Sequence, residues 1–168
     1  MAYAARTLGA RAQSSSEVRA KLRRRAARAA DVDEVLSRLK QAGYLNDKRF
    51  AEGFANWRRE NAGFGKTRVV RDLMARRVAP ALAIQATDAA YVESDETTMI
   101  EEFLARKYRG KNLNALLTEE KQLAAAYRKL RGAGFSPGNS IRVLKRYAAE
   151  ADRLEEMEES EPDRGPSD

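Results

Sequence analysis

The sequence predicts an all-α protein made of three tandem three-helix repeats that form an elongated, curved helical array. A helical pattern anchored by a leucine recurs at Leu22, Leu73 and Leu130, with spacings of 51 and 57 residues. A period near 50 residues with helical texture is typical of stacked helical units. Composition agrees, because helix-favouring residues dominate and no stretch alternates apolar and polar residues long enough for a strand.

Residues 1–45 form the first predicted repeat. A helix is expected from Tyr3 to Ala12, and a second begins after Ser14 and runs to about Arg28. Ser14 and Glu17 have capping-box spacing, in which the serine hydroxyl accepts from the Glu17 amide while the glutamate reaches back. A third helix starts near Asp31 and carries an apolar stripe at i, i+3, i+4 and i+7: Val32, Val35, Leu36 and Leu39.

Residues 46–93 form the second repeat, entered through a tight turn. Gly43 provides a left-handed helix end, and we expect Tyr44 and Phe50 to be buried where the first two repeats meet. Asn46 is the predicted N-cap of the next helix, whose stripe of Phe50, Phe54 and Trp57 is expected to lie in the core. The helix from about Lys66 is expected to bury Val69, Val70 and Leu73, and Pro80 to stand in the first turn of the sixth helix.

Residues 94–151 form the third repeat. Its first helix carries an apolar stripe from Ile100 to Tyr108, and a loop of about eight residues from Gly110 follows. The middle helix is anchored by Leu130, and Pro137 starts the last helix. The total is nine predicted helices in three triplets.

Charge is distributed unevenly along the chain. The net of +7 combines 32 basic and 25 acidic residues, but from Glu150 onward nine acidic residues face two basic ones. Residues 1–149 therefore carry 30 basic and 16 acidic residues, a formal charge of +14, which implies a polyanionic or strongly acidic partner. The acidic tail, residues 152–168, is expected to be disordered; it either aids solubility or competes with the anionic partner for the basic body.

Several function classes are disfavoured by what the chain lacks. It has no Cys and no His, which removes disulfides, the usual metal ligands and histidine acid–base chemistry. We therefore expect no cofactor, no metal and no enzymatic activity. No apolar run approaches the roughly 20 residues of a membrane span, so the expectation is a cytoplasmic protein without a membrane partner.

The motifs resemble the regulatory protein RecX family. The first repeat matches that family's pattern with Arg11, Ser14, Glu17, Val18, Lys21 and Leu22. The junction matches with Leu39, Gly43, Tyr44, Leu45, Asn46, Asp47, Arg49, Phe50 and Ala51. Further matches are Arg58, Gly65, Arg68 and Leu73, then Leu130, Gly134, Phe135 and Ile141. The resemblance covers about residues 4 to 149.

The sequence departs from that family's pattern at three places. A glycine commonly follows the basic residues that end the middle helix of the first two repeats, but here the stretches read Arg24-Arg25-Ala26 and Arg76-Arg77-Val78. Lys66 stands where the family often has proline. These changes affect the expected local geometry of the helix ends.

The resemblance implies a non-enzymatic modulator of the RecA recombinase, acting as a monomer. Such a protein lodges in the groove of the RecA filament on single-stranded DNA and restrains filament growth, strand exchange and ATP hydrolysis in recombination, DNA repair and the SOS response. The basic residues around two loops are the candidate contacts to RecA or DNA, because guanidinium and ammonium groups bind phosphates and carboxylates: Arg58, Arg59, Lys66, Arg68, Arg71, Lys107, Arg109 and Lys111.

Two other function classes stay open. A basic helical protein that binds single- or double-stranded DNA without RecA fits the charge equally well, and it predicts a steep dependence of binding on salt. A regulatory enzyme or nuclease is disfavoured by the missing histidine and the lack of an acidic metal cluster. Each basic candidate could also be an ordinary solvated residue on a helix face.

Overall fold

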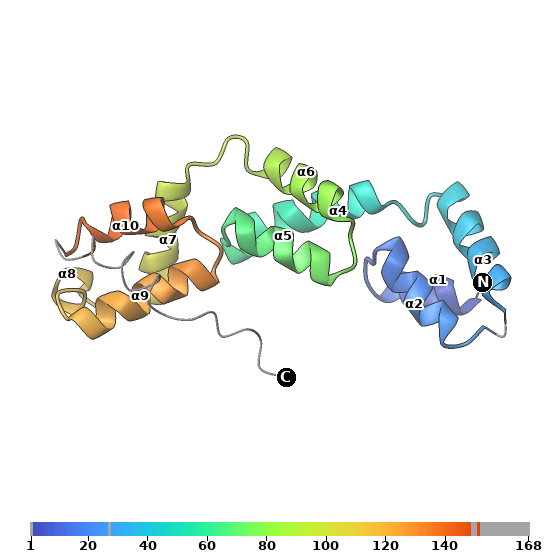
Figure 1. Ribbon diagram of the computed structural model, residues 1–168, viewed down its shortest axis with the longest axis horizontal. Coiled ribbons are helices and arrows are strands. Elements are labelled where there is room, and N and C mark those ends of the chain that lie inside the picture. The colour runs from blue at the N-terminus through green and yellow to red at the C-terminus, as the bar shows by residue number, and fades with distance from the viewer. Residues whose placement is uncertain (1, 27, 149–150, 152–168) are drawn as a thin grey trace. The chain divides into compact units, whose positions relative to one another are not determined.

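The computed structural model describes residues 2–26, 28–148 and 151. All regular structure in this part of the chain is helical (Figure 1), which confirms the all-α prediction. None of the described helices is long and apolar enough to cross a bilayer. The predicted tail, 152–168, lies outside the described residues.

The described chain contains ten α-helices and one π-helical turn. The elements are α1 (Ala2–Ala10), α2 (Ser15–Arg23), α3 (Ala29–Gln41), α4 (Asp47–Trp57), η1 (Arg58–Ala62), α5 (Lys66–Ala75), α6 (Pro80–Ala90), α7 (Glu96–Lys107), α8 (Leu113–Leu116), α9 (Glu120–Gly132) and α10 (Pro137–Leu144). The prediction of nine helices was therefore wrong: the four-residue helix α8 lies inside the predicted loop, where the Asn112 side chain caps it by accepting from the amide of Ala115.

The helix starts were predicted better than the helix ends. The Ser14–Glu17 capping box is present, the Asn46 side chain caps α4, and Pro80 and Pro137 stand in the first turns of α6 and α10. However, α1 ends at Ala10 rather than Ala12, and α2 ends at Arg23 rather than Arg28. After α2 the amides of Arg25 and Ala26 both donate to the Leu22 carbonyl, and Arg28 is already the extended N-cap of α3.

The chain separates into two compact units. Unit 1 is Met1–Ala62 with Val69–Glu93, and unit 2 is Gly63–Arg68 with Ser94–Asp168. The three repeats with boundaries at 45, 93 and 151 stay a prediction. The first residues of α5 are therefore part of unit 2, while the rest of that helix belongs to unit 1.

Unit 1 buries small and aliphatic side chains. One cluster joins α1, α2 and α3, and its fully buried members are Ala4, Val18, Val32, Leu36, Leu39 and Leu45. Elsewhere in unit 1, α4 packs on α6. The buried apolar side chains of α4, α5 and α6 are Ala51, Ala55, Val69, Leu73, Ala83, Ala86 and Ala90. Alanines on α4 and α6 let the two helix backbones approach closely.

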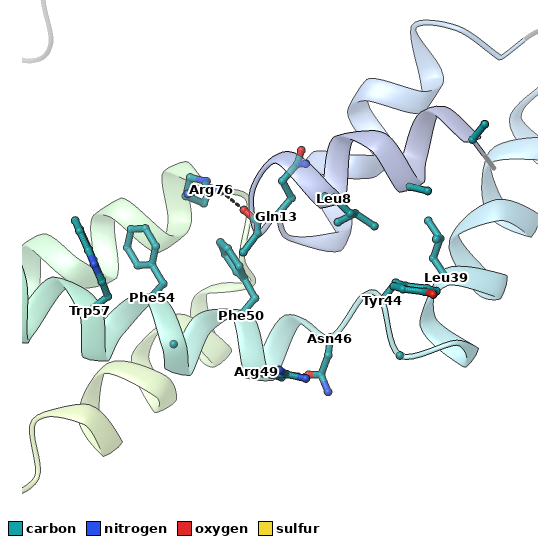
Figure 2. Close-up of a pocket in the computed structure, with 16 residues that line it drawn as sticks. Leu8, Gln13, Leu39, Tyr44, Asn46, Arg49, Phe50, Phe54, Trp57 and Arg76 are labelled. Carbon is teal, nitrogen blue, oxygen red and sulfur yellow. Dashed lines mark hydrogen bonds between the residues drawn. The ribbon is translucent and has the colours of Figure 1, made fainter.

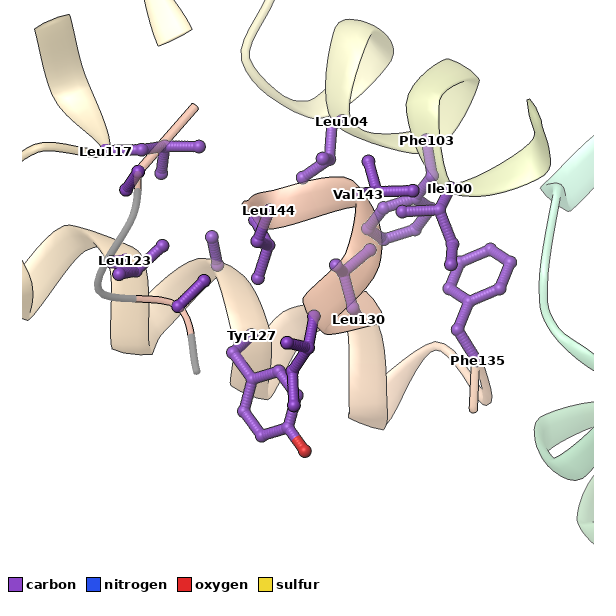
Figure 3. Packing of buried hydrophobic residues seen from close by; sticks show 14 of the residues in the cluster. Ile100, Phe103, Leu104, Leu117, Leu123, Tyr127, Leu130, Phe135, Val143 and Leu144 are labelled. Atoms are coloured by element: carbon purple, nitrogen blue, oxygen red, sulfur yellow. The ribbon is translucent and has the colours of Figure 1, made fainter. Parts of the chain in front are cut away.

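Unit 2 has a larger hydrophobic core, built where α10 packs against α7 and α9 (Figure 3). Phe103 and Phe135 meet edge to face in this core, with ring centroids 5.6 Å apart. The other large members are Ile100, Leu104, Tyr108, Leu117, Leu123, Tyr127, Leu130, Ile141, Val143 and Leu144. The predicted apolar stripes of this repeat are therefore core faces.

A close backbone contact joins the segment before α5 to the end of α9 within unit 2. The Gly65 amide donates to the Ala133 carbonyl at 2.9 Å, and the Thr67 amide donates to the Gly134 carbonyl at 3.3 Å. A Cβ atom on Gly65 would lie within 3.0 Å of the Gly134 backbone. Gly134 also has a φ of +91°, which favours glycine.

We predict that Gly65→Ala destabilises the protein by about 1–3 kcal/mol, because the added methyl group meets backbone that cannot move aside. The measurement is urea unfolding followed by circular dichroism. Gly132→Ala is the matched control, since a Cβ there meets nothing within 4 Å and alanine favours the helix. An equal response of both variants would contradict the assigned close contact.

Arg77 is the one described residue other than glycine with a positive φ, at 59°. It follows α5 at the place where the sequence lacks the expected glycine. The amides of Arg77 and Val78 donate to the carbonyls of Met74 and Leu73 and close the helix. The left-handed helix end therefore persists without glycine, at the cost of backbone strain.

Arg77→Gly should raise the free energy of unfolding by up to about 1 kcal/mol, because it removes the clash that a Cβ atom suffers in the left-handed conformation. Differential scanning calorimetry measures this change. The same substitution at Arg24, whose φ is −73°, should give no gain. A loss of stability at position 77 would show that the arginine side chain contributes more than the strain costs.

Candidate functional site

A partly buried ion pair connects the start of α2 with the end of α5 inside unit 1. The Arg76 guanidinium donates to both oxygens of the Glu17 carboxylate, at 2.6 and 3.1 Å, and to the Ala12 carbonyl at 2.9 Å. The Ser14 hydroxyl accepts from the Glu17 amide and donates to the Arg76 carbonyl at 2.6 Å. The capping box that the sequence predicts thus also ties together segments about 60 residues apart in sequence.

The charge of Glu17 is stabilised by this network. Burial raises the pKa of Glu17, but the hydrogen bond from Arg76, the amide of Ser14 and the positive charges of Arg76 and Arg11 outweigh it. The net result is a pKa below the ordinary value of 4.5. The carboxylate therefore stays ionised at neutral pH and holds Arg76 in place.

Beside Arg76 lies a mostly apolar groove with a volume of about 980 Å³ (Figure 2). One wall is formed by α1 and the residues that follow it, with Ala2, Ala5, Leu8, Gly9 and Ala12. The other wall is formed by the turn before α4 and by α4 itself, with the aromatic residues Tyr44, Phe50, Phe54 and Trp57. The other lining residues are Gln13, Leu39, Gly43, Asn46, Arg49, Gly53 and Arg76.

The predicted burial of these aromatic rings was wrong. Tyr44 is 71 % exposed and Trp57 is 55 % exposed, while Phe50 and Phe54 are half-buried. Helix α4 has a second apolar face, formed by Ala51 and Ala55, and that face packs in the core. The aromatic stripe consequently faces the groove, where Arg76 lies 5.0 Å from the centroid of the Phe50 ring.

Three of the predicted basic residues lie in unit 1. The Arg58 guanidinium pairs with Asp72 at 3.3 Å and lies 5.1 Å from the centroid of the Phe54 ring. Arg59 donates to the Ala90 carbonyl and to Glu60. Both arginines come from the π-helical turn η1 and are half-buried, whereas Arg71 on α5 is exposed.

The other five lie in unit 2. Arg68 donates to the Gly132 carbonyl at 3.0 Å and lies over the Phe64 ring. Four residues are exposed: Lys66, Lys107, Arg109 and Lys111. Lys107, Arg109 and Lys111 stand together where α7 ends and the chain turns at Gly110. The structure therefore does not gather the eight residues on one unit, and their role stays a prediction.

Reasoning from the sequence missed the groove, and with it Arg49 and Arg76. The signal available was the double apolar pattern of α4, with alanines on one face and large rings on the adjacent one. Within the described residues, no group of three or more acidic, His or Cys side chains could hold a metal ion. The chemistry that the surfaces offer is therefore binding through apolar contact and through arginine and lysine.

Two family models match the chain. The model described as "RecX, first three-helix domain" matches residues 1–39. The model described as "RecX, second three-helix domain" matches residues 46–86. These two stretches together contain most of the groove walls and the Glu17–Arg76 pair.

The chain is also similar to curated RecX proteins and to a solved RecX structure. The chain is 36 % identical over 159 residues to the Regulatory protein RecX of Deinococcus radiodurans, covering 95 % of this chain and 72 % of the relative. It is 32 % identical to the one of Thermus thermophilus, covering 86 % and 89 %, and 30 % identical to the one of Streptomyces coelicolor, covering 70 % and 61 %. The crystal structure of RecX from Lactobacillus salivarius superposes with a TM-score of 0.64 at 18 % identity, covering 86 % of this chain and 92 % of that chain.

The lowered pKa of Glu17 predicts a pH-dependent contribution to stability. The carboxylate's contribution is fully present above the unfolded-state pKa and is lost as pH falls through the folded-state pKa. Glu17→Gln should therefore cost about 1.5–3 kcal/mol at pH 7, and the difference from the original protein should shrink below about pH 4. Urea unfolding between pH 3 and 7 measures this.

Glu34→Gln is the matched control for this prediction. Glu34 pairs with Arg38, but both side chains are 61 % exposed, so its loss should cost less than about 1 kcal/mol. A difference between Glu17→Gln and the original protein that stays constant with pH would contradict the assigned pKa shift.

Proposed function

Because the chain belongs to the RecX family, we propose that it is a regulatory protein that binds the RecA filament on single-stranded DNA. Bound there, it restrains the recombinase and ATPase activities of RecA during recombination and DNA repair in the cytoplasm. It acts as a monomer, without a cofactor and without catalysing a reaction itself. The observation that carries this proposal is the 36 % identity to a Regulatory protein RecX over 95 % of the chain.

The charge of the chain supports the same proposal. Residues 1–149 carry a formal charge of +14, and a nucleoprotein filament presents phosphates along its length. Such a body is attracted to the filament over a distance set by the ionic strength. Affinity for the filament should therefore fall as salt rises.

The exposure of their side chains divides the eight candidate residues into two groups. Arg58, Arg59 and Arg68 bind other parts of their own unit, so substituting them would disturb the fold as well as any partner. The exposed members are Lys66, Arg71, Lys107, Arg109 and Lys111, and we propose these as the principal contacts to RecA or DNA. Their long side chains can extend toward an external anion while the charged head stays in water.

The alternative function is a basic protein that binds DNA without RecA. The charge alone fits it equally well, and the two functions differ in their dependence on the recombinase. A DNA binder would shift oligonucleotides in a gel with RecA absent. A RecA modulator would inhibit the ATPase at concentrations below those needed to coat the DNA.

We predict that the triple variant Arg71→Glu, Lys107→Glu and Arg109→Glu inhibits the single-stranded-DNA-dependent ATPase of RecA at least about tenfold less potently, because several weak ionic contacts of up to about 1 kcal/mol each are reversed together. The measurement is ATP hydrolysis against added regulator at two salt concentrations. The original protein should also lose potency at the higher salt.

A second triple variant controls for the change in net charge. Arg23, Arg24 and Lys40 are exposed basic residues at the ends of α2 and α3, and their reversal to Glu changes the net charge equally. The control should inhibit RecA almost as potently as the original protein, with only the small loss of potency that the lower net charge causes in both triple variants. Equal potency of both triple variants would show that only the overall charge matters, and absence of inhibition by the original protein would overturn the proposed function.

A further inference from the structure

The groove of unit 1 has the composition of a protein-binding hot spot. It is lined by four of the chain's twelve aromatic residues and by two arginines. Tyrosine, tryptophan, phenylalanine and arginine are the residues enriched where proteins bind one another tightly. Two of these rings, Tyr44 and Trp57, are more than half exposed.

The walls of the groove have the shape that receives a helix. On α1, Ala2, Ala5 and Gly9 line the groove at intervals of three and four residues, and these small side chains let a backbone approach. On α4, Phe50, Phe54 and Trp57 follow at i, i+4 and i+7, a row of rings roughly 10 Å long at 1.5 Å per residue. An amphipathic helix of two to three turns matches that length and inserts apolar side chains between the rings.

The charges of the groove favour a helix with acidic residues beside its apolar face. None of the sixteen lining residues is acidic, and Arg49 is exposed at one end of the ring row. Arg76 lies deeper and is already bound to Glu17. A ligand with carboxylates beside its apolar face would meet the Arg49 guanidinium and no opposing negative charge from the lining.

We propose that this groove is the docking site for an acidic amphipathic helix of the protein partner. The inference deepens the proposed function and rests on it, since the partner is then RecA itself. The groove supplies apolar anchoring through Tyr44, Phe50 and Trp57, while the exposed basic residues described above supply electrostatic attraction to the filament. Binding to RecA therefore has a salt-resistant part and a salt-sensitive part.

Single-stranded DNA fits the groove less well than a protein segment. A strand carries one phosphate per nucleotide and needs cations along its track, whereas the groove offers Arg49 and an arginine occupied by Glu17. Phosphates of a bound strand that lay against α1 would meet only small apolar residues there. A nucleic acid is accordingly the competing occupant in the test.

The single tryptophan of the chain reports directly on the groove. Full-length protein labelled with 5-fluorotryptophan gives one ¹⁹F resonance, from position 57. Unlabelled RecA without DNA should shift or broaden this resonance, and a 20-nucleotide oligo(dT) alone should not. If the resonance responds equally to oligo(dT) alone, the occupant of the groove is a nucleic acid and not a protein helix. If it moves with the concentration of the protein itself, the occupant is a second copy of the chain.

Paired variants test the groove through function. Tyr44→Ala with Trp57→Ala should raise the concentration for half-inhibition of the RecA ATPase at least about tenfold, and this loss should persist at high salt. Arg49→Glu should raise it about threefold or more. Ile84→Ala with Val92→Ala is the matched control, because these residues are 50 % and 79 % exposed in the same unit and do not line the groove.

The outcomes separate this inference from the proposed function. If the original protein inhibits RecA while the resonance of position 57 stays unchanged and the Tyr44/Trp57 variant inhibits like the control, the groove inference is wrong and the proposed function stands. If the original protein neither binds nor inhibits RecA, the proposed function fails and the groove loses RecA as its partner. Circular dichroism of each variant tests whether the helices remain folded.

Discussion

The ion pair between Glu17 and Arg76 is the interaction on which the arrangement of unit 1 depends. It joins the start of α2 to the end of α5, and both side chains are largely buried. Breaking it would leave a charge without its partner in a site of low polarity, which is more costly than the loss of a surface pair. The same arginine borders the aromatic wall of the groove through its contact with Phe50. The stability of unit 1 and the geometry of the groove therefore rely on one guanidinium group.

Short helices impose a general constraint on this fold, because each end leaves backbone groups without helical partners. The chain meets this constraint with caps that also join distant segments. In unit 1, Ser14 caps α2 and donates to Arg76. In unit 2, the Ser136 side chain caps α10, and Ser136 and Asn139 both donate to the Glu96 carboxylate at the start of α7. Capping residues are thus tertiary contacts in both units, so the loss of one cap would loosen more than a single helix.

The sequence was most informative where one local interaction decides the structure. The capping box at Ser14, the cap at Asn46 and the prolines that open α6 and α10 act within four residues, and their helix starts were predicted correctly. The end of α2 is closed by the amides of Arg25 and Ala26, which donate to the Leu22 carbonyl. The closure of α5 depends on Arg77 adopting a conformation that sequence rules reserve for glycine. The contact between Gly65 and Gly134 joins residues 69 positions apart. No local pattern contains that contact, which joins the segment around Gly65 to the end of α9.

The error at Tyr44 and Trp57 shows why the candidate site was harder to predict than the fold. Periodicity identifies an apolar face but not its partner, and α4 has two such faces. The alanine face packs on the alanines of α6, because small side chains allow the closest approach of two helices and the most complete exclusion of water. The aromatic face is then left over, and large rings that the core does not use remain in contact with solvent at an energetic cost. A partner helix that covers those rings would recover this energy on binding. The feature that misled the sequence-based prediction is therefore the physical basis for assigning the groove a binding role.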